Sequence, residues 1–212
     1  KDRTMDSAIH RLAQFPLIDL QSEAFRLRKV HFKNELTFSI PDTVSYHDDT
    51  LPLQEDRFAA ISVTGDRCDL RCAHCKGKLL ESMIPAADPE TFSDAVDHLR
   101  LKGAHGILVS GGADHNGEVP LEKFIPAIKK LKGNNPQFRV IVHTGLVQKE
   151  IAQKLRDAAV DQILVDIIGD EDTIHDVYHL NKRVEDYEKT LWMLKEMGHR
   201  LAPHIIIGHH FG

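Results

Sequence analysis

Residues 58–75 read FAAISVTGDRCDLRCAHC, an apolar run that ends at a glycine and is followed by three closely spaced cysteines. The run from Phe58 to Thr64 has the length and apolar character of a strand in a buried sheet. Gly65 ends it, because glycine accepts the backbone conformations that a sharp turn requires. We therefore predict a strand over Phe58–Thr64, with the cysteines in the loop at its carboxyl end.

The same order of strand, glycine-bearing loop and helix recurs along the rest of the chain. Apolar runs predict four more strands, at Gly106–Ser110, Phe138–His143, Gln162–Ile168 and His204–Ile207. Helical spacing predicts helices at Pro89–Leu101, Leu121–Leu131 (bent by Pro126), Gln148–Ala159 and Val184–Met197. Such alternation gives a parallel sheet with right-handed crossovers, and the apolar strands indicate burial on both faces. Repeats of roughly 30 to 40 residues suit a barrel or half-barrel of the α/β class.

The residues before Phe58 follow a different pattern. Helical spacing covers Met5–Gln14 and Gln21–Phe32, a short strand pattern covers Leu36–Ile40, and Ser45–Asp56 is turn-rich. We predict two parts, an N-terminal helical and extended segment over 1–57 and a barrel over 58–212. A barrel sheet does not end on an uncovered edge, so we expect the C-terminal part of the barrel beyond Gly212.

The composition is that of an ordinary globular domain. Of the 212 residues, 42% are hydrophobic and 28% are charged, and the formal net charge is −5. The Lys and Arg residues are scattered, which argues against nucleic acid or an anionic membrane as a partner. No apolar run reaches the roughly 18 residues that cross a bilayer, and Lys1–Asp6 does not resemble a signal peptide. We therefore expect a cytoplasmic protein.

All three cysteines lie within eight residues, at Cys68, Cys72 and Cys75. A disulfide framework distributes its cysteines along the chain, so this spacing, C-x3-C-x2-C, indicates a metal site instead. Three thiolates on a cubane cluster leave one iron without a protein ligand. The alternatives are a zinc site completed by His74 or a distant histidine, which lacks the usual second pair of cysteines, or three unconnected buried thiols.

The cysteine spacing after the first strand, with a Gly-Gly loop after the second, resembles the radical SAM superfamily. The resemblance extends from about Phe58 to Gly212 and implies a partial (β/α)6 barrel with an N-terminal helical extension. It also implies a [4Fe–4S] cluster on Cys68, Cys72 and Cys75 whose open iron binds S-adenosylmethionine. An electron donor reduces the cluster, and the resulting 5′-deoxyadenosyl radical takes a hydrogen atom from the substrate.

The resemblance assigns further cofactor contacts. Ser110, Gly111 and Gly112 correspond to a motif whose backbone meets the methionine amino group, although a Gly-Gly pair alone is often only a turn. The usual acidic residue of that motif is replaced by Ala113. His74 stands where the family often has an aromatic residue beside the adenine; the alternative is a solvent-exposed loop histidine.

Later strands contribute the remaining candidates. Asp166 is a carboxylate in an otherwise apolar strand, where it must find a polar partner, and the resemblance assigns it to the ribose of S-adenosylmethionine. A hydrogen-bonded core carboxylate is the alternative. His143 and Thr144 are expected at the barrel mouth, and Gly208 resembles a glycine that lies near the adenine.

Longer strings resemble one group within the superfamily. ISVTGDR at 61–67, KLLESMIP at 78–85, VHTGLV at 142–147, VYHL at 177–180 and PHIIIG at 203–208 are similar to biotin-synthase-like proteins, including subunits of two-component lipoyl synthases. The resemblance implies sulfur insertion into an octanoyl chain on a lipoyl carrier protein, with a related radical SAM subunit as partner. An auxiliary iron–sulfur cluster, as sulfur donor, would need ligands outside this chain segment.

Two other functions stay open from the sequence. One is a biotin-synthase-like radical reaction without sulfur transfer, such as a rearrangement or cofactor assembly. The other is a non-catalytic iron–sulfur or zinc protein that serves in electron transfer or as a scaffold, because a fold does not fix a function.

Overall fold

The computed structural model describes residues 11–12, 14–32, 34 and 57–211. The chain divides into two units, Lys1–Asp42 and Thr43–Gly212. The predicted boundary between 57 and 58 stays a prediction, because residues 43–56 lie outside the described ones. Most of Met5–Gln14 and all of Leu36–Ile40 and Ser45–Asp56 also lie outside them.

In the first unit the described helix is α2, Leu17–His31. It begins four residues before the predicted start at Gln21, directly after Pro16, whose fixed backbone angle suits a helix entry. None of its residues is buried. Of the described residues in both units, no helix is long and apolar enough to cross a membrane.

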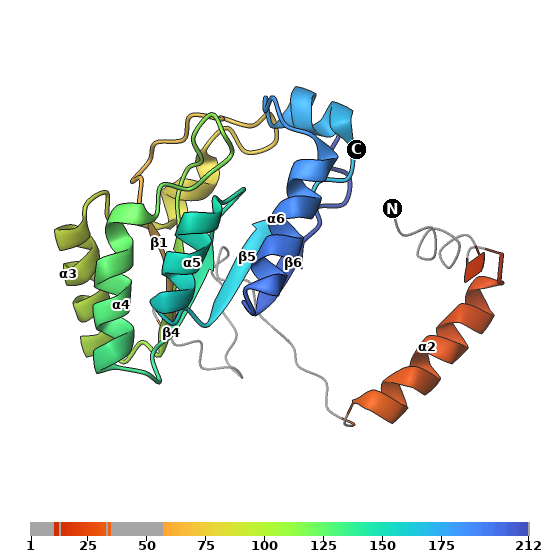
Figure 1. Cartoon of the computed structure of the whole chain (residues 1–212), viewed down its shortest axis with the longest axis horizontal. Coiled ribbons are helices and arrows are strands. Elements are labelled where there is room, and N and C mark those ends of the chain that lie inside the picture. Colours follow the sequence, from red (N-terminus) through yellow and green to blue (C-terminus); the bar gives the residue numbers. More distant parts are fainter. Residues whose placement is uncertain (1–10, 13, 33, 35–56, 212) are drawn as a thin grey trace, which may run out of the picture. The chain divides into compact units, whose positions relative to one another are not determined.

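In the second unit six parallel strands form one sheet in the order β2-β1-β3-β4-β5-β6. The strands are β1 Phe58–Ser62, β2 Ile84–Pro85, β3 Gly106–Ser110, β4 Arg139–His143, β5 Gln162–Asp166 and β6 Leu201–His204. The helices are α3 Pro89–Leu101, α4 Ile125–Asn134, α5 Lys149–Asp157 and α6 Val184–Glu196 (Figure 1). Short helical segments lie at Lys78–Ser82, Glu122–Phe124 and Thr173–Val177, the last of them a π-helix. The predicted α/β fold, a partial parallel barrel, is confirmed.

Apart from shifts of up to four residues at the ends of several elements, the structure differs from the prediction at three places. β2 was not predicted, because two residues are too short to show a periodicity. β6 begins at Leu201 and ends at His204, so the prediction of a strand over His204–Ile207 was wrong. Ile205 and Ile207 are 75% and 97% exposed instead of paired. Pro126 does not bend a helix but lies at the start of α4, where its missing N–H costs nothing.

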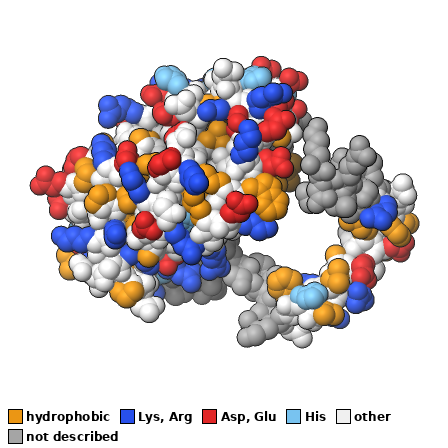
Figure 2. All heavy atoms as spheres, in the orientation of Figure 1, with side chains coloured by type: hydrophobic (Ala, Val, Ile, Leu, Met, Phe, Trp, Pro, Cys, Tyr) orange, Lys and Arg blue, Asp and Glu red, His pale blue; other side chains and the backbone are white. Residues whose placement is uncertain are grey.

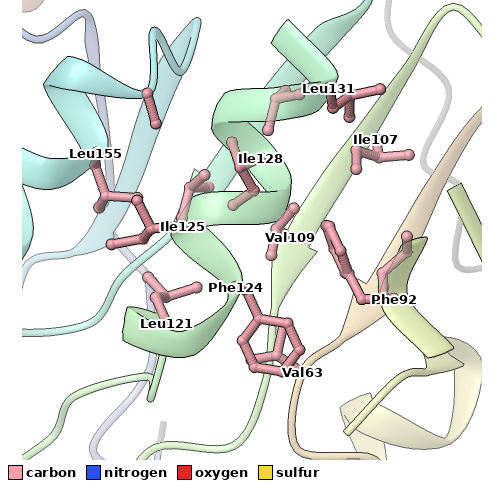
Figure 3. Packing of buried hydrophobic residues seen from close by; sticks show 14 of the residues in the cluster. Val63, Phe92, Ile107, Val109, Leu121, Phe124, Ile125, Ile128, Leu131 and Leu155 are labelled. Atoms are coloured by element: carbon pink, nitrogen blue, oxygen red, sulfur yellow. The ribbon is translucent and has the colours of Figure 1, made fainter. Parts of the chain in front are cut away.

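The two faces of the sheet have different surroundings, and the expectation of burial on both was wrong. Alternate strand residues on one face are fully buried: Ile61, Ile107, Val109, Val140, Val142, Ile163 and Val165. Helices α3 to α5 supply Phe92, Ile128 and Leu155 to the core on this face, and the short segment before α4 supplies Phe124 (Figure 3). On the other face Leu108, Ile141 and Leu164 are only half-buried. This second face is the concave side of a partial barrel, which the helices do not cover.

A buried lysine fixes the amino ends of the strands. Lys132, 7% exposed near the end of α4, donates to the carbonyls of Pro136 and Phe138 at 3.0 and 2.9 Å. Its ammonium group also lies 2.7 Å from the carboxylate of Asp161, which accepts the amide N–H of Val140 at 2.7 Å. The lysine therefore joins α4 to the entries of β4 and β5.

We expect Lys132→Met to lower the free energy of unfolding by about 2 kcal/mol, because it leaves buried carbonyls and a carboxylate without their donor. The measurement is urea denaturation at neutral pH. Lys130→Ala, an exposed position on the same helix, is the matched control and changes the midpoint little. Equal midpoints for the two variants would contradict this account of Lys132.

Candidate functional site

The three cysteines lie in the loop between β1 and β2, which curls tightly on itself. The carbonyl of Cys72 accepts the amide N–H groups of Cys75 and Lys76, at 3.2 and 2.8 Å. Arg71 and Lys76 adopt left-handed backbone conformations with φ of 44° and 52°, which residues other than glycine rarely do. The loop therefore holds a strained backbone that brings Cys68, Cys72 and Cys75 to one cavity.

The thiols are close enough to affect one another's ionisation. Burial raises the pKa of Cys72 to about 12, and the neighbouring Cys75 and Cys68 add to the rise. Cys72 is 6% exposed, whereas Cys68 and Cys75 are half-buried. Three clustered thiolates are unfavourable without a cation and favourable around one, because a metal ion compensates both their burial and their repulsion. The donor set therefore fits an iron–sulfur cluster.

The Gly-Gly loop after β3 packs directly beneath the cysteine loop. A Cβ on Gly112 would lie 2.0 Å from the carbonyl oxygen of Arg67 and 2.5 Å from the Cα of Cys68. The amide N–H of Gly112 donates to Thr64 Oγ1 at 2.7 Å, and the carbonyl of Ala113 accepts from the Asp69 amide at 3.0 Å. A close approach of the Gly112 backbone to a ligand was expected. In the structure the Gly112 backbone lies against the cysteine loop instead.

One cavity collects most of the predicted site residues. Its empty volume is about 800 Å³, part of it open to solvent. Nine of the predicted residues line it: Cys68, Cys72, Cys75, His74, Ser110, Gly111, Gly112, His143 and Asp166. The structure does not bring Thr144 and Gly208 to it; Thr144 is 1% exposed, and Gly208 lies in an exposed turn.

The cavity also has an apolar wall that sequence reasoning missed. Leu70, Leu146, Leu180, Tyr178 and Tyr187 form a second buried cluster with Cys72, separate from the main core. The carbonyl of Val177, in the π-helix, accepts the amide N–H of Ala73 at 2.8 Å and so ties this wall to the cysteine loop. π-helical turns are often found at functional sites, but the sequence contains no periodicity that would reveal one.

His74 is an exposed loop residue that also contacts an aromatic network. Its Nδ1 lies 3.1 Å from Nε2 of His209, and Nδ1 of His209 lies 3.3 Å from the hydroxyl of Tyr178. The ring centroids of His74 and His209 are 4.5 Å apart in an edge-to-face arrangement. Burial, with the charge of His209 as a further cause, lowers the pKa of His74, and burial likewise lowers that of His209. Both imidazoles are therefore neutral at pH 7, and His74 has one nitrogen engaged.

Asp166 lies between two histidines at the ends of the strands. Its Oδ1 is 3.5 Å from Nε2 of His143 and 3.6 Å from Nδ1 of His204. Burial acts to raise the pKa of Asp166, but interactions with His143 and then His204 outweigh it, and the pKa is lowered. The carboxylate is therefore ionised at neutral pH. His204 was not among the predicted site residues, because it was predicted as the first residue of an apolar strand, His204–Ile207, and gave no other signal.

Comparison with known proteins agrees with this geometry. The family model described as "Radical SAM superfamily" matches residues 62–211. The chain belongs to the radical SAM superfamily. Membership implies a [4Fe–4S] cluster and S-adenosylmethionine as cofactors. No curated protein matches its sequence.

Solved structures of radical SAM proteins share the fold at low sequence identity. The crystal structure of HydG, a maturase of the [FeFe]-hydrogenase, gives a TM-score of 0.57 at 17% identity over 72% of this chain and 35% of that one. Methylornithine synthase gives 0.54 at 13% identity, over 72% and 46%. The methyltransferase TsrM from Kitasatospora setae, solved with cobalamin and a [4Fe–4S] cluster, gives 0.50 at 15%, over 70% and 30%. The chain spans less than half the length of each.

The packing beneath the cysteine loop gives one prediction. In this radical SAM chain we expect Gly112→Ala to weaken iron retention at least about tenfold, because a Cβ at Gly112 displaces the backbone that carries Cys68. Iron and acid-labile sulfide are measured after anaerobic reconstitution and desalting. Gly133→Ala is the control, since a Cβ there meets nothing within 4 Å. Full iron retention in Gly112→Ala would contradict the contact.

The burial of Cys72 gives another prediction, for the metal-free chain. With a pKa of about 12, Cys72 is almost entirely protonated at pH 8, and the thiolate is the reactive form. We expect iodoacetamide to label Cys72 at least about tenfold more slowly than Cys68 or Cys75, with a rate that rises with pH. Peptide mass spectrometry measures each site, and labelling in guanidinium chloride must remove the difference. Equal rates in the folded chain would refute the burial of this thiol.

Proposed function

We propose that this chain is a radical SAM enzyme whose cluster is held by Cys68, Cys72 and Cys75. The observation that carries the proposal is the convergence of these thiols, the Gly-Gly loop and Asp166 on one cavity at the carboxyl ends of parallel strands, where α/β enzymes place their sites. When bound, the reduced cluster supplies the electron that cleaves S-adenosylmethionine to methionine and a 5′-deoxyadenosyl radical.

The protein's own groups orient the cofactor in this proposal. The acceptors that this loop can offer a methionine amino group are its carbonyl oxygens, because backbone N–H groups only donate, as that of Gly112 does to Thr64. The ionised Asp166 is suited to accept hydrogen bonds from ribose hydroxyls. The edge-to-face pair of His74 and His209 presents neutral rings beside which an adenine can pack.

The apolar wall has a protective role in this proposal. Leu146, Leu180 and the aromatic ring of Tyr178 are 6%, 3% and 7% exposed beside the cysteines. Apolar side chains exclude water and competing hydrogen donors from the volume in which a carbon radical would move. Burial raises the pKa of the Tyr178 hydroxyl above its usual range, so this phenol keeps its proton throughout the working pH range.

For the substrate, we propose the octanoyl chain of a lipoyl carrier protein, with this chain as one subunit of a two-component lipoyl synthase. Support comes from the strings shared with that group and from the predominantly apolar lining of the cavity, which includes Leu79, Leu80 and Met83. The sulfur donor would be an auxiliary cluster with ligands outside this segment, since all three cysteines of the chain lie in one loop.

The presence of only three cysteines in this chain also supports a second candidate, a biotin-synthase-like reaction without sulfur transfer. Such a rearrangement or cofactor-assembly step needs only the one cluster. The two candidates predict different products, since sulfur transfer leaves carbon–sulfur bonds on the octanoyl chain.

The test is anaerobic reconstitution with iron and sulfide, followed by S-adenosylmethionine, dithionite and mass-spectrometric measurement of 5′-deoxyadenosine. We expect formation by the wild type and loss to background in Cys72→Ser, because the cluster loses one of three ligands. Gly133→Ala is the matched control and stays active. Absence of 5′-deoxyadenosine from the wild type, or equal formation by Cys72→Ser, would overturn the proposal.

The substrate is tested in the same assay with an octanoylated carrier protein and the related partner subunit. Lipoyl synthesis predicts that the carrier stimulates 5′-deoxyadenosine formation and gains sulfur by intact mass. Cleavage that the carrier does not stimulate supports the second candidate and refutes the first.

A further inference from the structure

Three potential metal ligands meet at the carboxyl edge of the sheet, apart from the cysteine loop. His143, Asp166 and His204 are the last residues of β4, β5 and β6. Asp166 is the register partner of His204, and His143 is the partner of Leu164, two residues before Asp166. Residues paired in register, or two apart in a strand, project from the same face. All three side chains therefore project from the concave face.

Their spacing suits a shared cation better than direct hydrogen bonds. The two nitrogen–oxygen distances to Asp166 are 3.5 and 3.6 Å, longer than the 2.7–3.2 Å of ordinary N–H···O bonds. In a tetrahedral zinc site with bonds of about 2.1 Å, ligand atoms lie about 3.4 Å from one another. One ligand atom from each of the three residues lies within 4.8 Å of the others. A small rotation of each side chain would bring all three onto one ion.

The surroundings and the donor types point to a transition metal. The imidazoles of His143 and His204 stack at an interplanar angle of 24°, with Asp166 within ion-pair distance of both. Side-chain exposures of 23%, 31% and 48% for His143, Asp166 and His204 leave an ion partly desolvated but accessible. Two imidazole nitrogens and one carboxylate oxygen favour Zn²⁺ or Fe²⁺, whereas Mg²⁺ and Ca²⁺ prefer oxygen ligands.

We propose that His143, Asp166 and His204 bind one divalent transition-metal ion, with zinc as the ion that their donor set suits. Three protein ligands leave a further coordination position for water or for a heteroatom of a substrate, as in catalytic zinc sites. His143 and Asp166 also line the cofactor cavity, so that position is available to a molecule bound there. The site uses Oδ1 of Asp166, the oxygen that lies nearest both histidines, and leaves Oδ2 able to accept a hydrogen bond from a ribose hydroxyl.

Zinc binding is measured on the reconstituted protein, so that the cysteines are already occupied. After removal of loosely bound metal, equilibrium dialysis against zinc is expected to give one ion per chain. X-ray absorption at the zinc edge is expected to show nitrogen and oxygen at about 2.0–2.1 Å and no sulfur at about 2.3 Å. A sulfur shell, or zinc below stoichiometry, would overturn the site. Both readouts are independent of turnover and of the reaction proposed above.

Two variants test the ligands separately. We expect His204→Ala, which removes a half-exposed ring, and Asp166→Asn, which preserves shape, each to weaken zinc binding at least about a hundredfold. His98→Ala, an exposed histidine of α3, retains wild-type affinity. Circular dichroism confirms that the variants are folded. Wild-type affinity in either ligand variant would refute the proposal, and a loss of S-adenosylmethionine binding in Asp166→Asn with zinc retained would assign this carboxylate to the ribose instead.

Discussion

The contact on which the candidate site depends is the backbone-to-backbone packing of Gly112 against the cysteine loop. The Cα of Cys68 lies 2.5 Å from where a Cβ of Gly112 would be, so no side chain fits between the two loops. β1 and β3 are in register as far as Ser62 and Ser110, and the loops that follow them leave the sheet at the same level. The register of two strands thereby sets the height at which the three thiols lie above the barrel.

The two faces of the sheet have different roles, since one forms the hydrophobic core and the other carries the candidate site. Side chains on its convex face are fully buried under helices, and burying a branched aliphatic residue contributes about 1.5–3 kcal/mol. The concave face carries half-buried Leu108, Ile141 and Leu164 in its middle and polar residues where the strands end. On the face of this unit that Figure 2 draws, acidic and basic side chains are interspersed. The cysteines, histidines and carboxylate of the candidate site gather where the strands end, at the carboxyl edge of the sheet.

The sequence was sufficient to predict features that depend on local pattern. β3 and α3 have the predicted limits, because an apolar run before a Gly-Gly pair and an Asp-Pro helix start are local signals. The cysteine motif likewise predicted a loop whose three thiols line one cavity. β6 was misplaced because Ile205–Ile207 are as apolar as a strand but lie beyond Asp166, the last partner that β5 offers. His204, His209 and Tyr178 were not predicted as site residues. Each contacts residues that are distant in sequence, and no local pattern predicts such a contact.

The two groups of candidate metal ligands differ in the chemistry of their donor atoms. The thiols of the cysteine loop are soft donors that select iron–sulfur clusters, whereas the histidines and carboxylate of β4 to β6 are harder and select isolated ions such as Zn²⁺. A zinc site at the cysteines would need a fourth protein ligand, and His74 could offer only Nε2, because its Nδ1 lies 3.1 Å from Nε2 of His209. In the radical SAM superfamily, to which the chain belongs, the cluster takes three cysteines and keeps one iron open. The three thiols of this loop therefore suffice for a cluster, whereas zinc would require a further side chain.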